Sequence, residues 1–195
     1  TVNTRTNQKS GCNICSKKSS EPEIRILSEL KWFFDDINNR YKLDGVEIDI
    51  YIPKFNLGIE YDGHYFHKSR KDKDLEKNKF LLSQKINLIR VREHPMQLLS
   101  ENDLVVKTPL EKVNLDEILK KIYPFVDNNI KEKINIYLDK SSFINEEVYR
   151  KYRSYFPSPF PENSLLVTHP LISSEWDYDK NYPLRPENFS YGRRN

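Results

Sequence analysis

Apolar and polar residues alternate with a period of two between residues 46 and 52. The apolar positions are Val46, Ile48, Ile50 and Ile52. Successive side chains of a strand point to opposite faces of its sheet, so this pattern predicts a strand with one apolar face. Residues 53–56 have the composition of a turn, and residues 57–61 resume the apolar pattern. We therefore predict a β-hairpin over residues 46–61.

The segments around this hairpin predict a mixed α/β domain. A helix is expected from residue 20, because apolar residues recur at helical spacing from Ile24 to Phe34. Residues 38–44 are interpreted as a loop. A charged amphipathic helix is expected over 68–85, and a strand over 87–92 that ends before Pro95. The order helix, strand, strand, helix, strand is typical of a mixed sheet flanked by helices.

Past residue 95 the pattern is mainly helical. A short strand is expected over 104–107, and helices over 114–123, 127–138 and 143–155. A proline-rich run at 156–161 interrupts this pattern, and we place a domain boundary there. The remainder has few periodic signals and could be extended, so we expect a helical or extended C-terminal extension.

Acidic residues and histidines are concentrated in and just after the predicted hairpin. They are Asp49, Glu60, Asp62, His64 and His67. Glu60 and Asp62 share one face of their strand, and strand pairing can bring Asp49 close to them. Clustered carboxylates repel one another unless a cation lies between them, and hard oxygen ligands suit Mg²⁺ or Mn²⁺. Each acid alone has an ordinary interpretation as a solvent-facing or turn residue; together they favour a metal site, with His67 able to take a proton.

Glu23 admits two interpretations that can coexist. Ser20 is a candidate N-cap and Glu23 follows three residues later, as in a capping box. The same carboxylate, carried by the first helix, could instead point into an active site.

Cys12 and Cys15 are the two cysteines of the chain and have the spacing Cys-x-x-Cys. Two thiolates at this spacing form half of a tetrahedral zinc site, and a complete Zn²⁺ site would need ligands outside this sequence. A redox pair and two ordinary cysteines are the alternatives. Few cysteines indicate a reducing compartment.

Composition narrows the class of protein. The chain has 195 residues, 37% of them hydrophobic and 31% charged, with a net charge of +3. This mild basicity permits nucleic-acid binding without establishing it. No apolar run is long enough to span a membrane, and the polar start shows no signal peptide, so we expect a cytoplasmic location. Because the first residue is Thr1, we expect a fragment of a longer protein.

Five separated motifs occur in order between residues 20 and 95. They are Glu23, EIDIYIP at 47–53, GIEYDGHYFH at 58–67, the pattern Asp74-x-x-Lys77-Asn78, and LIRVRE at 88–93. This order resembles the very-short-patch-repair (Vsr)-like endonucleases of the PD-(D/E)xK restriction-endonuclease-like superfamily. The resemblance implies a restriction-endonuclease-like α/β fold and hydrolysis of DNA phosphodiester bonds with Mg²⁺ or Mn²⁺.

The resemblance also implies roles for individual residues. Asp49 would be the principal metal ligand, and Glu60 or Asp62, with the Tyr61 carbonyl, would complete the metal site. His67 would be the general base or would position water. Glu23 would hold water or metal from the first helix.

Other residues would support these roles. Asp74, or its neighbour Asp72, would orient His67 or the substrate. Contacts to DNA phosphates are expected from Lys77, Arg90 and Arg92, whereas His64 is a bystander or a DNA contact.

One position departs from the superfamily pattern. Asp62 stands where the (D/E)xK element has its lysine. This moves the water-activating role toward His67, as in the subgroup with a Glu–Asp–His–Asp signature. It leaves open whether Asp62 is a ligand or a turn residue.

Both ends of the chain resemble parts of bacterial and viral zinc-ribbon repeats. The N-terminal match is RTNQKSGCNICSKK, and the C-terminal match begins at SLLVTHPLISSEW and ends in PENFSYGRRN. We therefore expect four parts: a truncated ribbon at 1–19, a Vsr-like core at 20–105, a helical extension at 106–160 and the start of a second ribbon at 161–195.

Two functions compete at this point. The leading hypothesis is a DNA endonuclease that nicks DNA or cuts both strands. The alternative is a non-catalytic DNA-binding or interaction module that retains the nuclease fold. DNA is the expected partner in both, and a homodimer is compatible with double-strand cleavage.

Overall fold

The computed structural model describes residues 19–153, 164–181, 185–186 and 189. Contacts along the chain divide it into two units, one spanning Arg25–Asn145 and one made of the flanking segments Thr1–Ile24 and Glu146–Asn195. Each unit is described separately. The expected division at residues 105 and 106 stays a prediction, although residues 112–138, which follow it, belong by contacts to the same unit as the residues before it.

The unit Arg25–Asn145 is built on a five-stranded mixed sheet in the order β1-β2-β3-β4-β5. The strands are β1 Asn38–Leu43, β2 Val46–Ile52, β3 Leu57–Asp62, β4 Asn87–Glu93 and β5 Leu104–Val106. β1, β2 and β3 pair antiparallel, whereas β4 is parallel to both β3 and β5. The predicted α/β fold is confirmed, and this mixed sheet flanked by helices is compatible with a restriction-endonuclease-like core.

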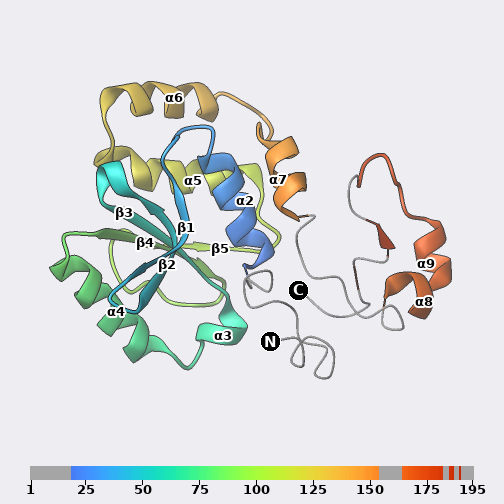
Figure 1. Ribbon diagram of the computed structural model, residues 1–195, viewed down its shortest axis with the longest axis horizontal. Coiled ribbons are helices and arrows are strands. Elements are labelled where there is room, and N and C mark those ends of the chain that lie inside the picture. Colours follow the sequence, from blue (N-terminus) through green and yellow to red (C-terminus); the bar gives the residue numbers. More distant parts are fainter. Residues whose placement is uncertain (1–18, 154–163, 182–184, 187–188, 190–195) are drawn as a thin grey trace, which may run out of the picture. The chain divides into compact units, whose positions relative to one another are not determined.

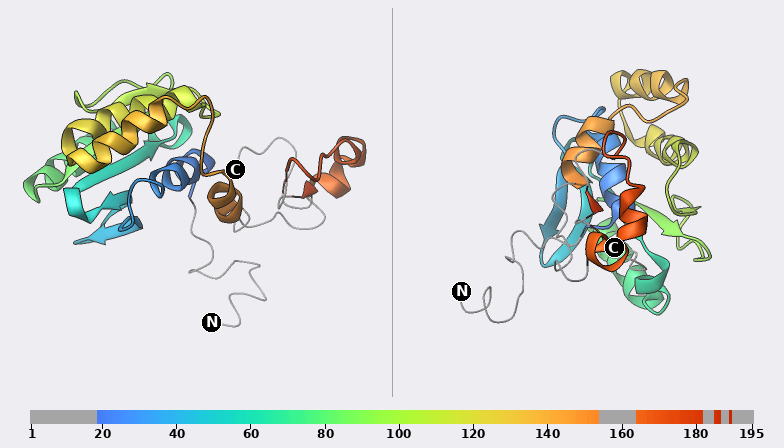
Figure 2. Two further views of the ribbon diagram at one scale, coloured as in Figure 1. Left: turned by 90° about the horizontal axis from the view of Figure 1, so that it is seen from above. Right: turned by 90° about the vertical axis from the view of Figure 1, so that its right-hand side faces the viewer.

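Helices cover both faces of this sheet (Figures 1 and 2). The main core lies between one face and the helices α5 Lys112–Ile122 and α6 Asn128–Leu138, with residues 26–30 of α2 Glu21–Leu30. On the other face, Leu81 of α4 Lys71–Ser83 packs with Ile48, Tyr51 and Ile86. Alternation along β3 therefore sends Ile59 into the main core and Glu60 toward α4.

Two short connections shape the hairpin region. The 3-10 turn η1 Pro53–Phe55 and Asn56, in the left-handed conformation with φ 46°, join β2 to β3. The helix α3 His64–His67 follows β3 directly, and a second 3-10 turn, η2 Tyr123–Phe125, joins α5 to α6. The predicted turn at 53–56 and the predicted elements at 46–52, 57–61, 68–85 and 87–92 are confirmed, with small shifts at their ends.

The loop predicted at 38–44 is wrong, because residues 38–43 form the edge strand β1. β1 pairs with β2 through Leu43↔Val46, and only Asp44 and Gly45 lie between the two strands. Both have positive φ, 48° and 83°. An Asp-Gly pair is a strong signal for such a two-residue hairpin turn, and it follows a short alternation in which Tyr41 and Leu43 are the apolar positions.

A buried carboxylate ties α2 to the end of this unit. Glu29 is fully buried and accepts hydrogen bonds from the Tyr137 hydroxyl at 2.8 Å and the backbone N–H groups of Ile144 at 3.2 Å and Asn145 at 3.1 Å. Burial, and then the Glu29 charge, raise the pKa of Tyr137. These bonds attach the segment after α6 to the helix that precedes the sheet.

The flanking unit contributes α7 Glu146–Arg153, α8 Leu165–Thr168 and α9 Pro170–Ser174. The helix predicted at 143–155 is confirmed as α7 over residues 146–153, and residues 154–155 lie outside the described residues. The two short helices α8 and α9 lie in the C-terminal part, for which we expect a helical or extended structure. The proline-rich run at 156–161 lies outside the described residues. Among the described residues, no helix has the length and apolar character needed to cross a membrane.

Candidate functional site

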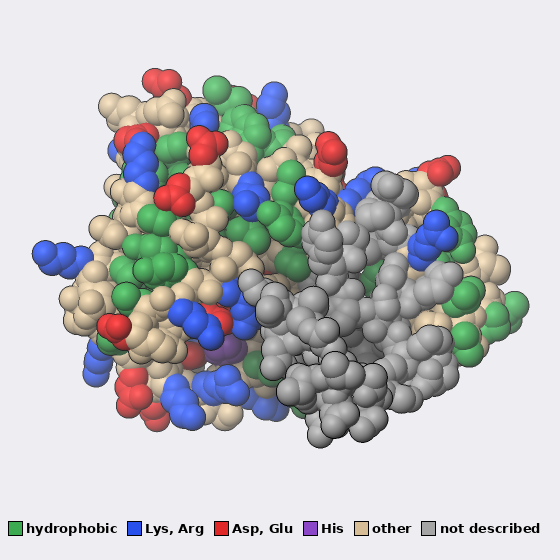
Figure 3. All heavy atoms as spheres, viewed as in Figure 1, with side chains coloured by type: hydrophobic (Ala, Val, Ile, Leu, Met, Phe, Trp, Pro, Cys, Tyr) green, Lys and Arg blue, Asp and Glu red, His purple; other side chains and the backbone are tan. Residues whose placement is uncertain are grey.

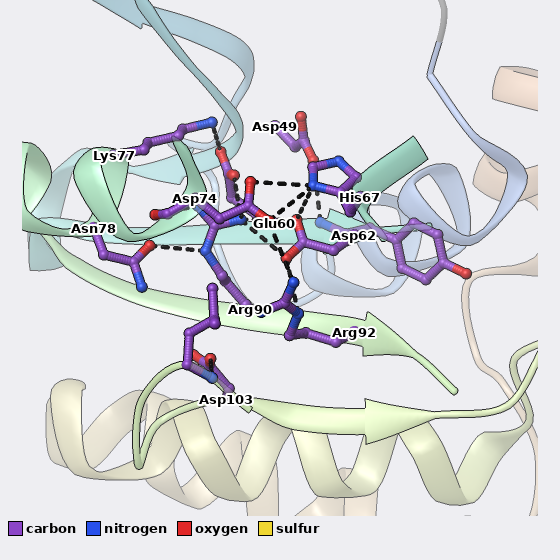
Figure 4. A network of polar contacts seen from close by, with 12 residues as sticks. Asp49, Glu60, Asp62, His67, Asp74, Lys77, Asn78, Arg90, Arg92 and Asp103 are labelled. Atoms are coloured by element: carbon purple, nitrogen blue, oxygen red, sulfur yellow. Dashed lines mark hydrogen bonds and ion pairs between the residues drawn. The ribbon is translucent and has the colours of Figure 1, made fainter. Parts of the chain in front are cut away.

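A network of charged side chains lies between the sheet and α4 (Figure 4). The parallel pairing of β3 with β4 places Glu60 opposite Arg90 and Asp62 opposite Arg92. All four residues are at most 3% exposed. Because strand side chains alternate, both acids and both arginines point to the α4 face while Ile59, Ile89 and Val91 pack in the main core.

All three guanidinium nitrogens of Arg90 donate hydrogen bonds. Its Nη1 donates to both Asp62 oxygens at 2.7 and 3.0 Å and lies 3.1 Å from Glu60 Oε2. Its Nε donates to Asn78 Oδ1 at 2.8 Å, and its Nη2 to the Asp74 carbonyl at 3.4 Å. Burial alone would lower the pKa of Arg90, but the surrounding carboxylates outweigh it and the pKa is raised. Arg90 is therefore a permanent cation of the network.

Arg92 is held less completely. Its Nη2 donates to Asp74 Oδ2 at 3.2 Å, and its Nε lies 3.3 Å from Asp62 Oδ2. Within the described part of the chain, its buried Nε and Nη1 have no hydrogen-bond partner. An ion pair without good hydrogen-bond geometry leaves part of the desolvation cost of a guanidinium uncompensated.

His67, at the end of α3, joins two of the acids. Its Nδ1 lies 3.2 Å from both Asp74 oxygens and 3.5 Å from Asp62 Oδ1. Its side chain is 22% exposed, whereas those of Asp62 and Asp74 are 1% and 7% exposed. The imidazole is therefore the member of this cluster that solvent or a substrate can reach. Of the two candidate acids on α4, the structure places Asp74 against His67, and Asp72 is exposed.

Asp62, His67 and Asp74 can hold a metal ion. Each offers a ligand atom, and the three atoms lie within 4.8 Å of one another. Two carboxylates and an imidazole suit several divalent cations, so the donor set does not identify the metal. The resemblance-based set of Asp49, Glu60 and Asp62 shares only Asp62 with this cluster.

Asp49 and Glu60 lie beside the cluster. Asp49 Oδ2 accepts a hydrogen bond from the Tyr61 backbone N–H at 3.1 Å, across the end of the β2–β3 pairing. Glu60 forms an ion pair with Lys77 through Oε1 and with Arg90 through Oε2. Burial, followed by Glu93 and Asp62, raises the pKa of Tyr61, so this phenol remains neutral at ordinary pH.

Three residues predicted to meet phosphates have other partners. Arg90 and Arg92 are 0% and 2% exposed and bind the acids. Lys77 is 25% exposed and bonded to Glu60. The alternation of NLIRVR placed both arginines on one face but could not show that this face is covered by α4. In the structure they neutralise buried carboxylates instead of facing solvent.

Glu23 occupies the position expected of a capping residue. Its Oε2 accepts from the Ser20 backbone N–H at 3.1 Å, and its own N–H donates to Ser20 Oγ at 3.3 Å. This reciprocal pair is the predicted capping box. Glu23 belongs to the flanking unit, which is described separately from the charged network. Its proposed role in catalysis stays a prediction, and Cys12 and Cys15 lie outside the described residues.

The surface next to His67 is aromatic and basic. Tyr65 and Phe66 are 76% and 65% exposed, with their rings in an edge contact at 5.1 Å. The following exposed cations are Lys68, Arg70, Lys71 and Lys73. Figure 3 shows Lys and Arg side chains gathered over α3 and α4 around a histidine. The run HYFHKSRKDK carries this signal in the sequence, although our prediction of DNA contacts named other residues.

His64 and Glu93 fix the start of α3. The His64 backbone N–H donates to Glu93 Oε2 at 2.8 Å, and Glu93 Oε1 accepts from Thr108 Oγ1 at 2.7 Å. The His64 side chain is half-buried, and its expected role as bystander or DNA contact stays a prediction.

A carboxylate that holds one imidazole nitrogen leaves the other available for proton transfer, and the same carboxylate can share a cation with its neighbour. The network therefore has the groups for metal-assisted hydrolysis. Comparison of the chain with family models, curated proteins and solved structures gives no match in any of the three.

Proposed function

We propose that the unit Arg25–Asn145 is a metal-dependent endodeoxyribonuclease. The observation that supports this proposal best is the convergence of Asp62, His67 and Asp74 from β3, α3 and α4 to one cluster with a reachable imidazole. The order of motifs along 20–95 points to the same reaction class. We take DNA as the substrate and Mg²⁺ or Mn²⁺ as the ion.

Asp62 and Asp74 would hold the ion, with His67 or Asp49 beside them. A divalent cation bound there would polarise a phosphodiester and favour deprotonation of a bound water. The carboxylates are buried on strands and helix, and a rigid frame of this kind limits their reorganisation during reaction.

His67 is proposed as the general base. Asp74 holds its Nδ1 at 3.2 Å, which leaves Nε2 as the nitrogen for a substrate water. As a metal ligand, Nδ1 would have to exchange its contact with Asp74 for the ion. As a general base, the ring would keep Nδ1 on Asp74 and accept the proton at Nε2.

DNA would meet the surface beside His67. Tyr65 and Phe66 expose ring faces on which bases can stack, and the exposed cations from Lys68 to Lys73 can contact phosphates. This surface takes the place of the buried Arg90 and Arg92 as the expected contact with the DNA backbone.

One observation favours the alternative of a non-catalytic module. The charges of Glu60, Asp62 and Asp74 are matched by Lys77, Arg90 and Arg92, three negative against three positive. A network neutral in itself can serve as a structural core that binds DNA at its surface without cutting it.

Nicking of supercoiled plasmid separates these functions. The wild-type chain is incubated with Mg²⁺ or Mn²⁺ beside His67→Ala and Asp74→Asn, and each variant has a matched control. His94→Ala removes an exposed histidine outside the network, and Asp72→Asn changes the exposed acid of the same helix turn. Loss of a general base typically reduces the rate about 10²- to 10⁴-fold.

We expect both network variants to lose nicking and both controls to retain it. Wild-type protein that binds DNA without nicking it would support the non-catalytic module. Equal cleavage by His67→Ala and His94→Ala would show that the proposed base is not used.

A further inference from the structure

The two buried arginines of the network differ in how well their donors are satisfied. Arg90 places all three guanidinium nitrogens on acceptors. Arg92 makes one hydrogen bond, to Asp74, and within the described chain its Nε and Nη1 have none, although the side chain is 2% exposed. Buried donors without acceptors destabilise the folded protein, so moving Arg92 out of its position costs less free energy than moving Arg90.

Arg92 contacts the two carboxylates of the candidate metal cluster. Its Nη2 lies 3.2 Å from Asp74 Oδ2, the oxygen that also lies 3.2 Å from His67 Nδ1. Its Nε lies 3.3 Å from Asp62 Oδ2. A divalent cation that took Oδ2 of each acid would compete with the guanidinium for these oxygens, and its two positive charges would repel the guanidinium.

We propose that Arg92 is an internal competitor for the metal ion. Its guanidinium holds Asp62 and Asp74 in the metal-free protein and withdraws from them when a divalent cation binds both carboxylates. Arg90 stays in place and keeps the network together in both states. Arg92 thereby sets the metal concentration at which the site fills. This inference rests on the metal site of the proposed function.

Manganese binding tests the inference without any measurement of cleavage. Mn²⁺ is titrated into wild type and Arg92→Met by calorimetry, with circular dichroism to verify that the variant is folded. One opposite charge within 4–6 Å lowers the pKa of a carboxylate by about one to three, which is a tenfold or larger change in its affinity for a proton. By the same repulsion, removing Arg92 is expected to tighten Mn²⁺ binding at least about tenfold. Arg92→Lys retains a cation and should return affinity toward wild type.

Lys77→Met is the matched control, because it removes one positive charge that pairs with Glu60 and frees no oxygen of the cluster. Its gain in affinity should stay below that of Arg92→Met by about threefold or more. Equal gains would show that net charge alone sets the affinity and would overturn the inference. If Arg92→Met does not fold, Arg92→Gln is judged by the same criterion.

The remaining outcomes separate this inference from the nuclease. If wild type binds Mn²⁺ and Arg92→Met binds it equally or more weakly, the competitor role is overturned and the metal site stands. Binding by Arg92→Met alone supports it. Mn²⁺ bound by none of the proteins refutes both the inference and the metal site. Altered metal affinity without plasmid nicking would refute only the nuclease.

Discussion

Replacing Arg90 by methionine tests whether the buried acids depend on a guanidinium. Met retains an unbranched apolar stem and removes the charge and every donor. The change breaks contacts of Nη1 at 2.7 and 3.0 Å to Asp62 and 3.1 Å to Glu60, and the 2.8 Å bond from Nε to Asn78. Asp62 and Glu60 are then left 1% and 3% exposed with one cation fewer.

Removing one partner of a buried ion pair costs about 3–5 kcal/mol, because the other charge stays desolvated. Small domains have about 5–15 kcal/mol of stability in total, so this loss takes a large share of it. Urea unfolding with m near 2 kcal/mol/M converts the loss to a fall in midpoint of about 2 M. Circular dichroism at pH 7 with a chelator present measures it in the absence of bound metal.

Two comparisons make the result specific. Arg40→Met removes an arginine that pairs with Glu47 at 2.6 Å, with both side chains at least 25% exposed, and should cost less than about 1 kcal/mol. Adding Asp62→Asn to Arg90→Met should recover part of the loss, since it removes the stranded charge. If Arg90→Met is no more destabilised than Arg40→Met, the acids do not need the arginine and the reasoning is refuted.

Tyr137→Phe should cost about 1–3 kcal/mol in urea unfolding at pH 7, because Glu29 loses a buried donor. Burial and Glu29 raise the pKa of Tyr137 above its usual 10.0, so the stability that the tyrosine contributes is present below pH 10 and lost as pH rises further. The Phe variant should lack that alkaline loss, and parallel curves of stability against pH above pH 10 would contradict this. Gly58→Ala should cost about 1–3 kcal/mol by thermal unfolding, since its Cβ would lie 3.0 Å from a packed side chain, and an unchanged midpoint would show that the neighbours yield freely. The hydrogen bond from Lys54 lowers the pKa of Asp127 below 3.8, so its stabilisation is present above that pH and lost below it; the melting-temperature gap between wild type and Asp127→Ala should narrow on acidification and not widen.

The hairpin and its acids could be predicted because their signal is local. Alternation from Val46 to Ile52 predicts the strand, and the acids follow in the same short stretch. In the structure both faces of this strand are buried, because Ile50 and Ile52 pack in the main core while Ile48 packs with Tyr51 on the other face.

β1 was harder to predict, since its alternation is limited to Tyr41 and Leu43, which are only partly buried at the edge of the sheet. The Asp44-Gly45 turn that follows is its strongest sequence signal.

The partners within the network depend on pairings that sequence pattern does not reveal. The spacing of Glu60 and Asp62 gives their shared face, but not that β4 lies parallel beside them with Arg90 and Arg92 opposite. The choice between the two acids of the first turn of α4 depended on which side of the helix faces His67. The structure gives that orientation to Asp74.

The pairing of acids with arginines across β3 and β4 also restricts how the strands can align. Apolar alternation excludes a slip by one residue, which would turn every side chain to the opposite face. A slip by two residues keeps the faces and would pass that test. It would set Asp62 against Arg90 or Glu60 against Arg92 and leave the other acid and the other arginine buried without their counterparts. The charged pairs thus select one of the two strand registers that the hydrophobic pattern allows equally. Mutations that neutralise the site would also remove this selection against the shifted register.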